Sequence, residues 1–162
     1  MAIRNIRTDG DEILRKKSKE VDIINDKILT LINDMTDTLR DAEGLGLAAP
    51  QVGILKRVIV LDDGNGLMQL LNPVIISESG EQEELEGCLS IPERFGEVKR
   101  PMKVVVEALN PDGEKTVIEG EGLLARILCH EIDHLNGILF KDKALRLVTR
   151  EELDEDYEEE EE

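Results

Sequence analysis

Two histidines four residues apart, with a glutamate beside the first, are the side chains best suited to chemistry in this sequence. Residues 130–134 read His-Glu-Ile-Asp-His. Side chains at positions i and i+4 share one face of a helix, so His130 and His134 can reach the same metal ion. Glu131 can act as a general base on a water that the metal activates. The spacing therefore predicts a metal site carried on a helix.

The alternative is that the two histidines are exposed on a polar helix. They are the only histidines among the 162 residues. The same segment also carries the apolar residues Leu123, Leu124, Ile127 and Leu128, which favour a buried helix. A metal site is therefore the preferred interpretation.

A catalytic metal site usually has three protein ligands and one open position, so a third ligand is needed. The candidates are Cys88, Cys129, Asp142, Glu151 and Glu152. Helical geometry turns Cys129 away from its neighbour His130 by roughly 100°, which favours packing. Cys88 follows a glycine that permits close backbone approach, and it is the favoured ligand. Sulfur combined with imidazole suits Zn²⁺ or Fe²⁺ better than Mg²⁺ or Ca²⁺.

A glycine-rich segment, GLGLAAPQ at residues 44–51, is the second candidate site. Its GxG lacks a third glycine in register and follows a helix instead of a strand, which disfavours dinucleotide binding. Small residues permit close packing or the close approach of a ligand's backbone. The amide of Gln51, if buried here, needs hydrogen-bond partners or donates to a ligand.

Three segments together closely resemble the peptide deformylases. GLGLAAPQ at 44–51, EGCLS at 86–90 and HEIDH at 130–134 occur in the order of the family's motifs, and the resemblance covers residues 1–145. It implies a metal-dependent hydrolase that removes the formyl group from the N-terminal formyl-methionine of newly made bacterial or organellar proteins and releases formate. The implied roles are metal ligands at Cys88, His130 and His134, a general base at Glu131, and oxyanion donors from the Gln51 amide and the Leu89 backbone N–H.

The resemblance also implies how substrate and cofactor bind. The peptide is expected to lie extended against two backbone segments, with the methionine side chain in an apolar pocket. The implied substrate-binding residues are Gly44, Leu45, Gly46, Glu86, Gly87, Leu123 and Ile127. The implied cofactor is one divalent ion, Fe²⁺ in cells, for which Zn²⁺, Ni²⁺ or Co²⁺ can substitute. The implied partners are formyl-methionyl nascent peptides, with transient proximity to the ribosome.

Two other functions fit parts of the sequence, and one residue departs from the family pattern. A zincin-type peptidase would use Glu151 or Glu152 as its third ligand. A non-catalytic relative would bind N-termini without a base, and the presence of Gln51 and Glu131 argues against it. Cys129 stands where most of the family has glutamine, so its thiol could compete for the metal, although packing is the favoured interpretation.

The elements expected to position these motifs alternate between helices and short strands. Helical periodicity covers residues 25–42, before Gly44, and residues 122–136, before Gly137. Strands are expected at residues 57–61, 68–71, 74–77, 104–109 and 115–119, with a hairpin turn at Asn110–Gly113. Thr149 and Glu152 match a capping box for a short last helix. We expect an α+β fold with antiparallel or mixed sheets around the central helix that carries HExxH.

Charge is distributed unevenly along the chain, whose formal net charge is −17. Residues 151–162 hold ten of the 37 acidic side chains and no basic one, so 27 acidic face 20 basic side chains in residues 1–150. We expect a catalytic domain at 1–150 and a disordered or partly helical acidic tail at 151–162. The acidic excess argues against direct nucleic-acid or membrane binding, and the tail would be repelled by ribosomal RNA.

The sequence predicts a cytoplasmic protein. The N-terminal residues contain no apolar core of signal-peptide length. No segment approaches the roughly 18 apolar residues that span a bilayer. In a reducing compartment, Cys88 and Cys129 are more readily explained by metal binding, catalysis or packing than by a disulfide.

Overall fold

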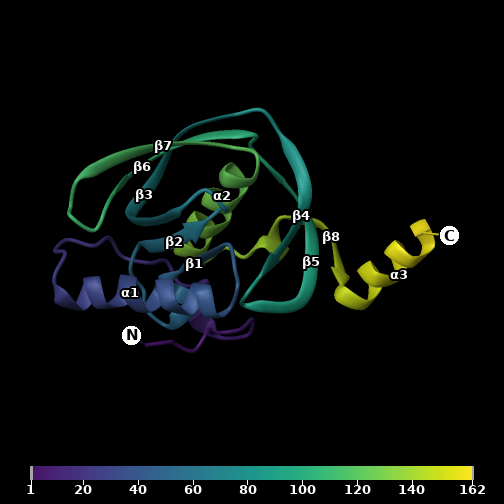
Figure 1. Ribbon diagram of the computed structural model, residues 1–162, viewed down its shortest axis with the longest axis horizontal. Helices are drawn as coiled ribbons and strands as arrows, with labels where there is room; N and C mark the ends of the chain where they lie inside the picture. The colour runs from purple at the N-terminus through teal and green to yellow at the C-terminus, as the bar shows by residue number, and fades with distance from the viewer. Residues whose placement is uncertain (1, 162) are drawn as a thin grey trace.

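Two antiparallel sheets and a central helix form the body of the molecule (Figure 1). The structure, a computed structural model, describes residues 2–161, with side chains described as far as residue 155. One sheet has the order β1-β2-β3-β6-β7 (Gly46–Ala48, Val58–Asp62, Leu67–Ser79, Lys103–Leu109 and Lys115–Glu121). The other has the order β4-β5-β8 (Gln82–Cys88, Ile91–Arg100 and Ala144–Thr149). The predicted α+β fold is confirmed.

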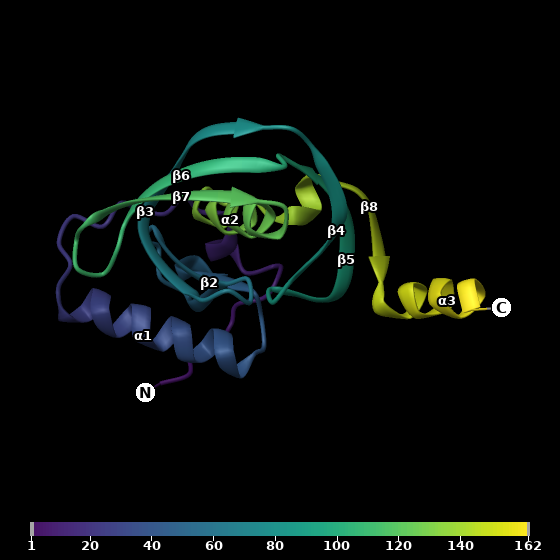
Figure 2. The ribbon, with the colours of Figure 1, turned by 45° about the horizontal axis from the view of Figure 1, so that its top comes forward.

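The described helices lie at very different depths in the molecule. They are α1 (Asp26–Asp41), α2 (Leu123–Leu135) and α3 (Arg150–Glu161), with short 3₁₀ turns η1 (Glu12–Arg15), η2 (Ala49–Val52) and η3 (Phe140–Asp142). Figure 2 shows α2 enclosed by strands, α1 beneath the body, and α3 projecting away from it. No helix within residues 2–161 is long and apolar enough to cross a membrane.

Helix α2 is buried because it packs a broad apolar face against the larger sheet. Ala125, Leu128 and Leu135 are fully buried in one hydrophobic cluster with residues of β2, β3 and β6. The helix begins after Gly122, whose φ of 61° most side chains avoid, and ends before Gly137 at φ 75°. The predicted helix at 122–136 is therefore correct to within one residue at each end.

Helix α1 covers the opposite side of β1 and β2. The side chain of Asn25 accepts a hydrogen bond from the Ile28 backbone N–H at 3.0 Å, which caps the first turn. Leu31, Met35 and Leu39, at helical spacing, are buried in a second hydrophobic cluster with residues of β1 and β2. The predicted helix at 25–42 is confirmed.

The strands differ from the prediction in two ways. The segments expected at 68–71 and 74–77 are one strand, β3, whose pairing with β6 shifts register between Leu71 and Val74. Asn72, with a φ of 51°, and Pro73 lie at this shift, which explains why the pattern appeared broken. Strands β1, β4, β5 and β8 were not predicted. Strand β1 has only three residues, charged residues obscure the alternation in β4 and β5, and most side chains of β8 are exposed whichever face they lie on.

The hairpin of β4 and β5 brings the second motif to the centre of the molecule. A two-residue turn, Leu89 and Ser90, joins the strands, and Cys88 pairs with Ile91 across it. The next pair along the ladder is Gly87 with Phe95, so residues 92–94 of β5 bulge outward. Cys88 therefore ends β4 at a point where the backbone leaves the regular ladder.

An ion pair joins η1 to η3 at the edge of this body. The Arg15 guanidinium donates to both carboxylate oxygens of Asp142, and Asp142 also accepts from the Leu139 N–H at 3.1 Å. The hydrogen bond from Arg15 holds the pKa of Asp142 below its ordinary value. Because the folded-state pKa is lowered, this stabilisation is present above the ordinary aspartate pKa and is lost as pH falls through the lowered one.

We therefore expect Asp142→Asn to lower the free energy of unfolding at pH 7 by about 1 kcal/mol or less, the range for a partly exposed ion pair. Urea unfolding at pH 7 and at pH values below about 4 measures the difference from the unsubstituted protein. The difference in unfolding free energy between the two proteins should become smaller in acid. A difference that did not change with pH would contradict the ion pair between Arg15 and Asp142.

Candidate functional site

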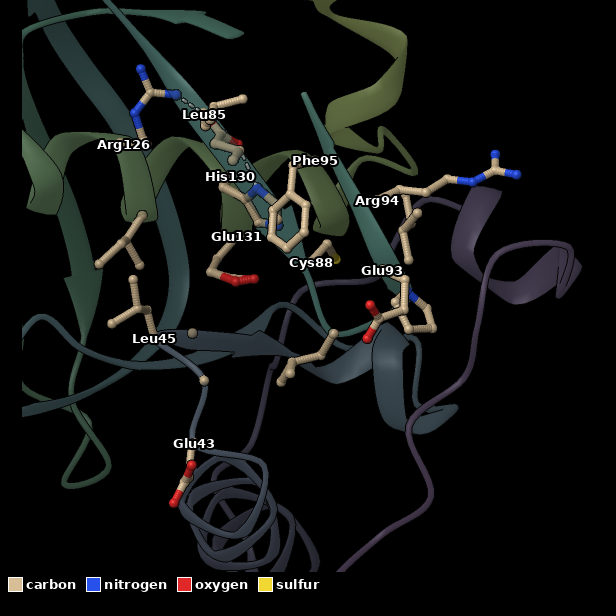
Figure 3. A pocket seen from close by; sticks show the side chains of 18 of the residues that line it. Glu43, Leu45, Leu85, Cys88, Glu93, Arg94, Phe95, Arg126, His130 and Glu131 are labelled. Carbon is tan, nitrogen blue, oxygen red and sulfur yellow. Dashed lines mark hydrogen bonds and ion pairs between the residues drawn. The ribbon is translucent and has the colours of Figure 1, made fainter. Parts of the chain in front are cut away.

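The three sequence motifs meet where α2 faces the β4–β5 hairpin and β1. Ligand atoms of Cys88, His130 and His134 all lie within 4.8 Å of one another, and the Cys88 Sγ is 3.3 Å from the His134 Nε2. In Figure 3, His130 and Glu131 extend from α2 toward the cleft, and Cys88 lies beside them. A sulfur and two imidazole nitrogens at this spacing fit a divalent transition metal.

The other candidate ligands lie elsewhere. Among the described residues, Cys88, His130 and His134 form the one group of this kind with metal-binding spacing. Asp142 binds Arg15, and the α3 residues Glu151 and Glu152 are exposed outside this group. Neither glutamate lies where it could be the third metal ligand, so the structure does not support the zincin-type peptidase.

Cys129 packs in the hydrophobic cluster around α2 and is 5% exposed. Burial raises the pKa of its thiol to about 11. Because the thiolate is the form that binds metal, this environment disfavours competition by Cys129 for the ion. The structure therefore supports the packing interpretation of this residue.

His130 is oriented by a buried carboxylate. The Glu86 Oε1 is 2.7 Å from the His130 Nδ1, which leaves the Nε2 of the ring for a metal. Arg100 donates to both oxygens of Glu86, at 2.8 and 2.9 Å, and Arg126 donates to one of them. Burial alone would raise the pKa of Glu86, but the hydrogen bonds from Arg100 and His130 lower it to about 2. The carboxylate is therefore held ionised.

The same network fixes α2 against the hairpin. Arg100 on β5 also donates to Asp133 at 2.6 Å, and Arg126 donates to the Val98 carbonyl at 3.0 Å. The sequence did not predict that Arg100, Arg126 and Asp133 support the site. The one available signal was an arginine within the apolar run from Leu123 to Leu128, which indicates a buried partner for its charge.

Glu131 lies buried at the base of the cleft. Glu131 is 2% exposed, and its Oε1 has no hydrogen-bond partner among the described residues. Burial raises its pKa to about 7. Gly46 makes room for it, because a Cβ at that position would lie 2.8 Å from the Glu131 Oε2. A carboxylate with this pKa and no partner can accept a proton and return it near neutral pH.

Gln51 is held between the backbone and the hairpin turn. Its Oε1 accepts from the Ala48 N–H at 2.9 Å, and its Nε2 donates to the Ser90 Oγ at 3.0 Å. The Nε2 also lies 3.6 Å from the Cys88 Sγ. The predicted oxyanion donor is therefore adjacent to the candidate metal ligand, and Ser90 is a contact that sequence reasoning missed.

A cleft of about 510 Å³ lies over these groups. Strands β1 and β4 stand at edges of the two sheets, and residues of both line the cleft. The residues predicted from the resemblance to bind substrate all line it: Gly44, Leu45, Gly46, Glu86, Gly87, Leu123 and Ile127. Glu86 differs from the others because its carboxylate is turned into the protein, toward Arg100 and His130.

A buried HExxH helix, a cysteine completing a candidate metal site and a cleft between two strand edges define a metal-dependent hydrolase. The model of the polypeptide deformylase family matches residues 3–150. The chain belongs to the peptide deformylase family. It is 62% identical over 154 residues to the peptide deformylase of Acetivibrio thermocellus, covering 95% of this chain and 91% of that protein.

Solved structures agree with this assignment. The peptide deformylase of Thermotoga maritima superposes with a TM-score of 0.88 at 40% identity, covering 90% of this chain and 100% of that one. That of Synechococcus elongatus, in complex with actinonin, superposes with a TM-score of 0.85 at 40% identity, covering 94% of this chain and 82% of that one. The fold and the family assignment therefore rest on both sequence and structure.

Because Glu86 orients His130, we expect Glu86→Gln to weaken metal binding by roughly 10- to 100-fold. Competition of the protein with a chromogenic chelator for Zn²⁺ or Co²⁺ measures this affinity. Glu84→Gln is the matched control, since Glu84 is exposed on the same strand. Equal metal affinity in both variants would show that the Glu86 carboxylate does not tune the site.

Proposed function

We propose that this protein removes the formyl group from the N-terminal formyl-methionine of newly synthesised proteins and releases formate. Membership of the peptide deformylase family supports the activity. The observation that carries the assignment to this chain is the meeting of Cys88, His130 and His134 with the buried, unpartnered carboxylate oxygen of Glu131 in one cleft. A metal site beside a general base is the set of groups used in metal-assisted hydrolysis of an amide.

Each group in the cleft has a distinct chemical task in this proposal. A divalent ion held by Cys88, His130 and His134 would polarise the formyl carbonyl and activate a water. Glu131 takes the proton from the water and gives it to the leaving amine, for which its pKa of about 7 is suited. The Gln51 Nε2 and the Leu89 backbone N–H donate hydrogen bonds to the oxygen on which negative charge develops.

Substrate binding in this proposal depends on the main chain of the peptide. An extended peptide can pair with backbone along Gly44–Gly46 and along Glu86–Leu89, on opposite sides of the cleft. Glu86 takes part through its backbone, since its side chain is committed to Arg100. The methionine side chain packs against the apolar wall formed by Leu123 and Ile127. Because the rest of the peptide is recognised through its main chain, one enzyme can act on many sequences.

The resident metal and the surroundings of the reaction also belong to the proposal. Fe²⁺ is the ion proposed for cells, and Zn²⁺, Ni²⁺ or Co²⁺ fit the same sulfur and nitrogen ligands. Because formyl-methionine occurs on nascent chains, we propose that the enzyme acts where proteins are synthesised, in the cytoplasm and transiently near the ribosome. The metal content of protein purified without oxygen identifies the ion.

The metal-loaded protein is expected to release formate from a short formyl-methionyl peptide, and Glu131→Gln is expected to lower kcat at least 100-fold. The substitution keeps the size of the side chain and leaves the three metal ligands unchanged, so metal content should not change. A coupled formate assay and metal analysis measure the two quantities. If the loaded protein released no formate, the proposed function would be wrong.

We further propose that residues 1–150 form the catalytic domain. The residues lining the cleft end at Arg150, and α3 extends from the body beyond that point (Figure 2). Deletion of residues 151–162 is therefore expected to leave kcat/KM for short formyl-methionyl peptides within about twofold of the full chain. A collapse of kcat/KM on truncation would instead assign the acidic helix to the active fold.

A further inference from the structure

The orientation of the Gln51 amide is fixed by two contacts of opposite chemical character. The Ala48 backbone N–H is only a donor, so it must face the Oε1 of the amide, which it does at 2.9 Å. The Nε2 then lies at the other end of the group, 3.0 Å from the Ser90 Oγ. A hydroxyl can accept as well as donate, and facing an amide nitrogen it accepts.

Ser90 is itself held rigidly. It is 0% exposed and lies in the two-residue turn between Cys88 and Ile91. Its backbone carbonyl accepts a hydrogen bond from the Asp9 N–H at 2.8 Å, which fixes the turn from the N-terminal segment. The same turn carries Leu89, whose backbone N–H is the second proposed oxyanion donor.

The amide nitrogen of Gln51 has two hydrogens, and they serve different partners. One is donated to the Ser90 Oγ at 3.0 Å, and the other is donated to the Cys88 Sγ at 3.6 Å, so it points toward the candidate metal ligands. Under the proposed function, this second side is where negative charge develops on the formyl oxygen. A donor already held on the metal-site side of the amide needs little reorganisation to reach that oxygen.

We propose that Ser90 is a positioning residue, which by accepting one Nε2 hydrogen of Gln51 directs the other toward the metal site. This inference rests on the proposed function, because the amide acts as a donor only if an oxyanion forms beside the metal site. Ser90 does not contact the substrate in this proposal and acts only through Gln51. Loss of its oxygen leaves a buried amide hydrogen without an acceptor and allows the amide to move.

The first experiment compares Ser90→Ala with Ser18→Ala. Ser18 is the matched control, since it is also buried but its Oγ has no hydrogen-bond partner among the described residues. We expect Ser90→Ala to lower kcat for a formyl-methionyl peptide by about tenfold, less than loss of an oxyanion donor itself. KM should stay within about twofold and metal content should be unchanged, whereas Ser18→Ala should resemble the unsubstituted enzyme.

A double-substitution cycle separates positioning from a general structural effect. If Ser90 acts through Gln51, then Gln51→Ala with Ser90→Ala should be no slower than Gln51→Ala alone. Losses that multiply would overturn the proposal, as would an unchanged kcat in Ser90→Ala. Either result would leave the proposed function standing, because that is tested separately by formate release from the unsubstituted enzyme.

Side-chain NMR of the unsubstituted protein provides a test that needs neither activity nor the folding of a variant. The two Nε2 hydrogens of Gln51 should differ, with the one bonded to Ser90 exchanging more slowly with solvent than in free glutamine. Exchange of both hydrogens at the rate of free glutamine would overturn the proposal.

Discussion

The site depends on the buried carboxylate of Glu86 and on the hydrogen-bond donors that compensate for its loss of water. Removing an ionised Glu86 from water is costly unless charged donors surround it, and breaking such a set by removing one partner is strongly destabilising. Arg100, Arg126 and His130 provide those donors from β5 and α2. The electrostatic requirement of Glu86 therefore brings together the hairpin that carries Cys88 and the helix that carries both histidines.

Elements with a strong hydrophobic period were predictable from the sequence. Helices α1 and α2 and strands β2, β6 and β7 lie within two residues of the expected bounds. The β4–β5 hairpin was not predicted as strands, because its charged residues do not follow a period of two. Glu83, Glu84 and Lys99 are exposed, whereas Glu86 and Arg100 are buried. Charge patterns of this kind resemble those of loops when only the sequence is considered.

The site could be predicted only in part, for a related reason. His130, Glu131 and His134 form a local pattern, and the choice of Cys88 over other candidates was helped by family resemblance. The contacts that orient these groups join positions far apart in the chain, such as Gln51 with Ser90 and Glu86 with Arg126. Such pairs are brought together by the packing of the helices and strands. No periodicity in the sequence predicts this packing.

The cleft between β1 and β4 also bears on the behaviour of the protein at high concentration. An unpaired strand edge is a template for pairing with another chain, and here residues of two edge strands line the same cleft. Strand β1 is three residues long, and β4 carries exposed glutamates at positions 83 and 84. Both features disfavour pairing of these edges with other copies of the chain, and they leave the cleft open for the extended peptide proposed to bind there.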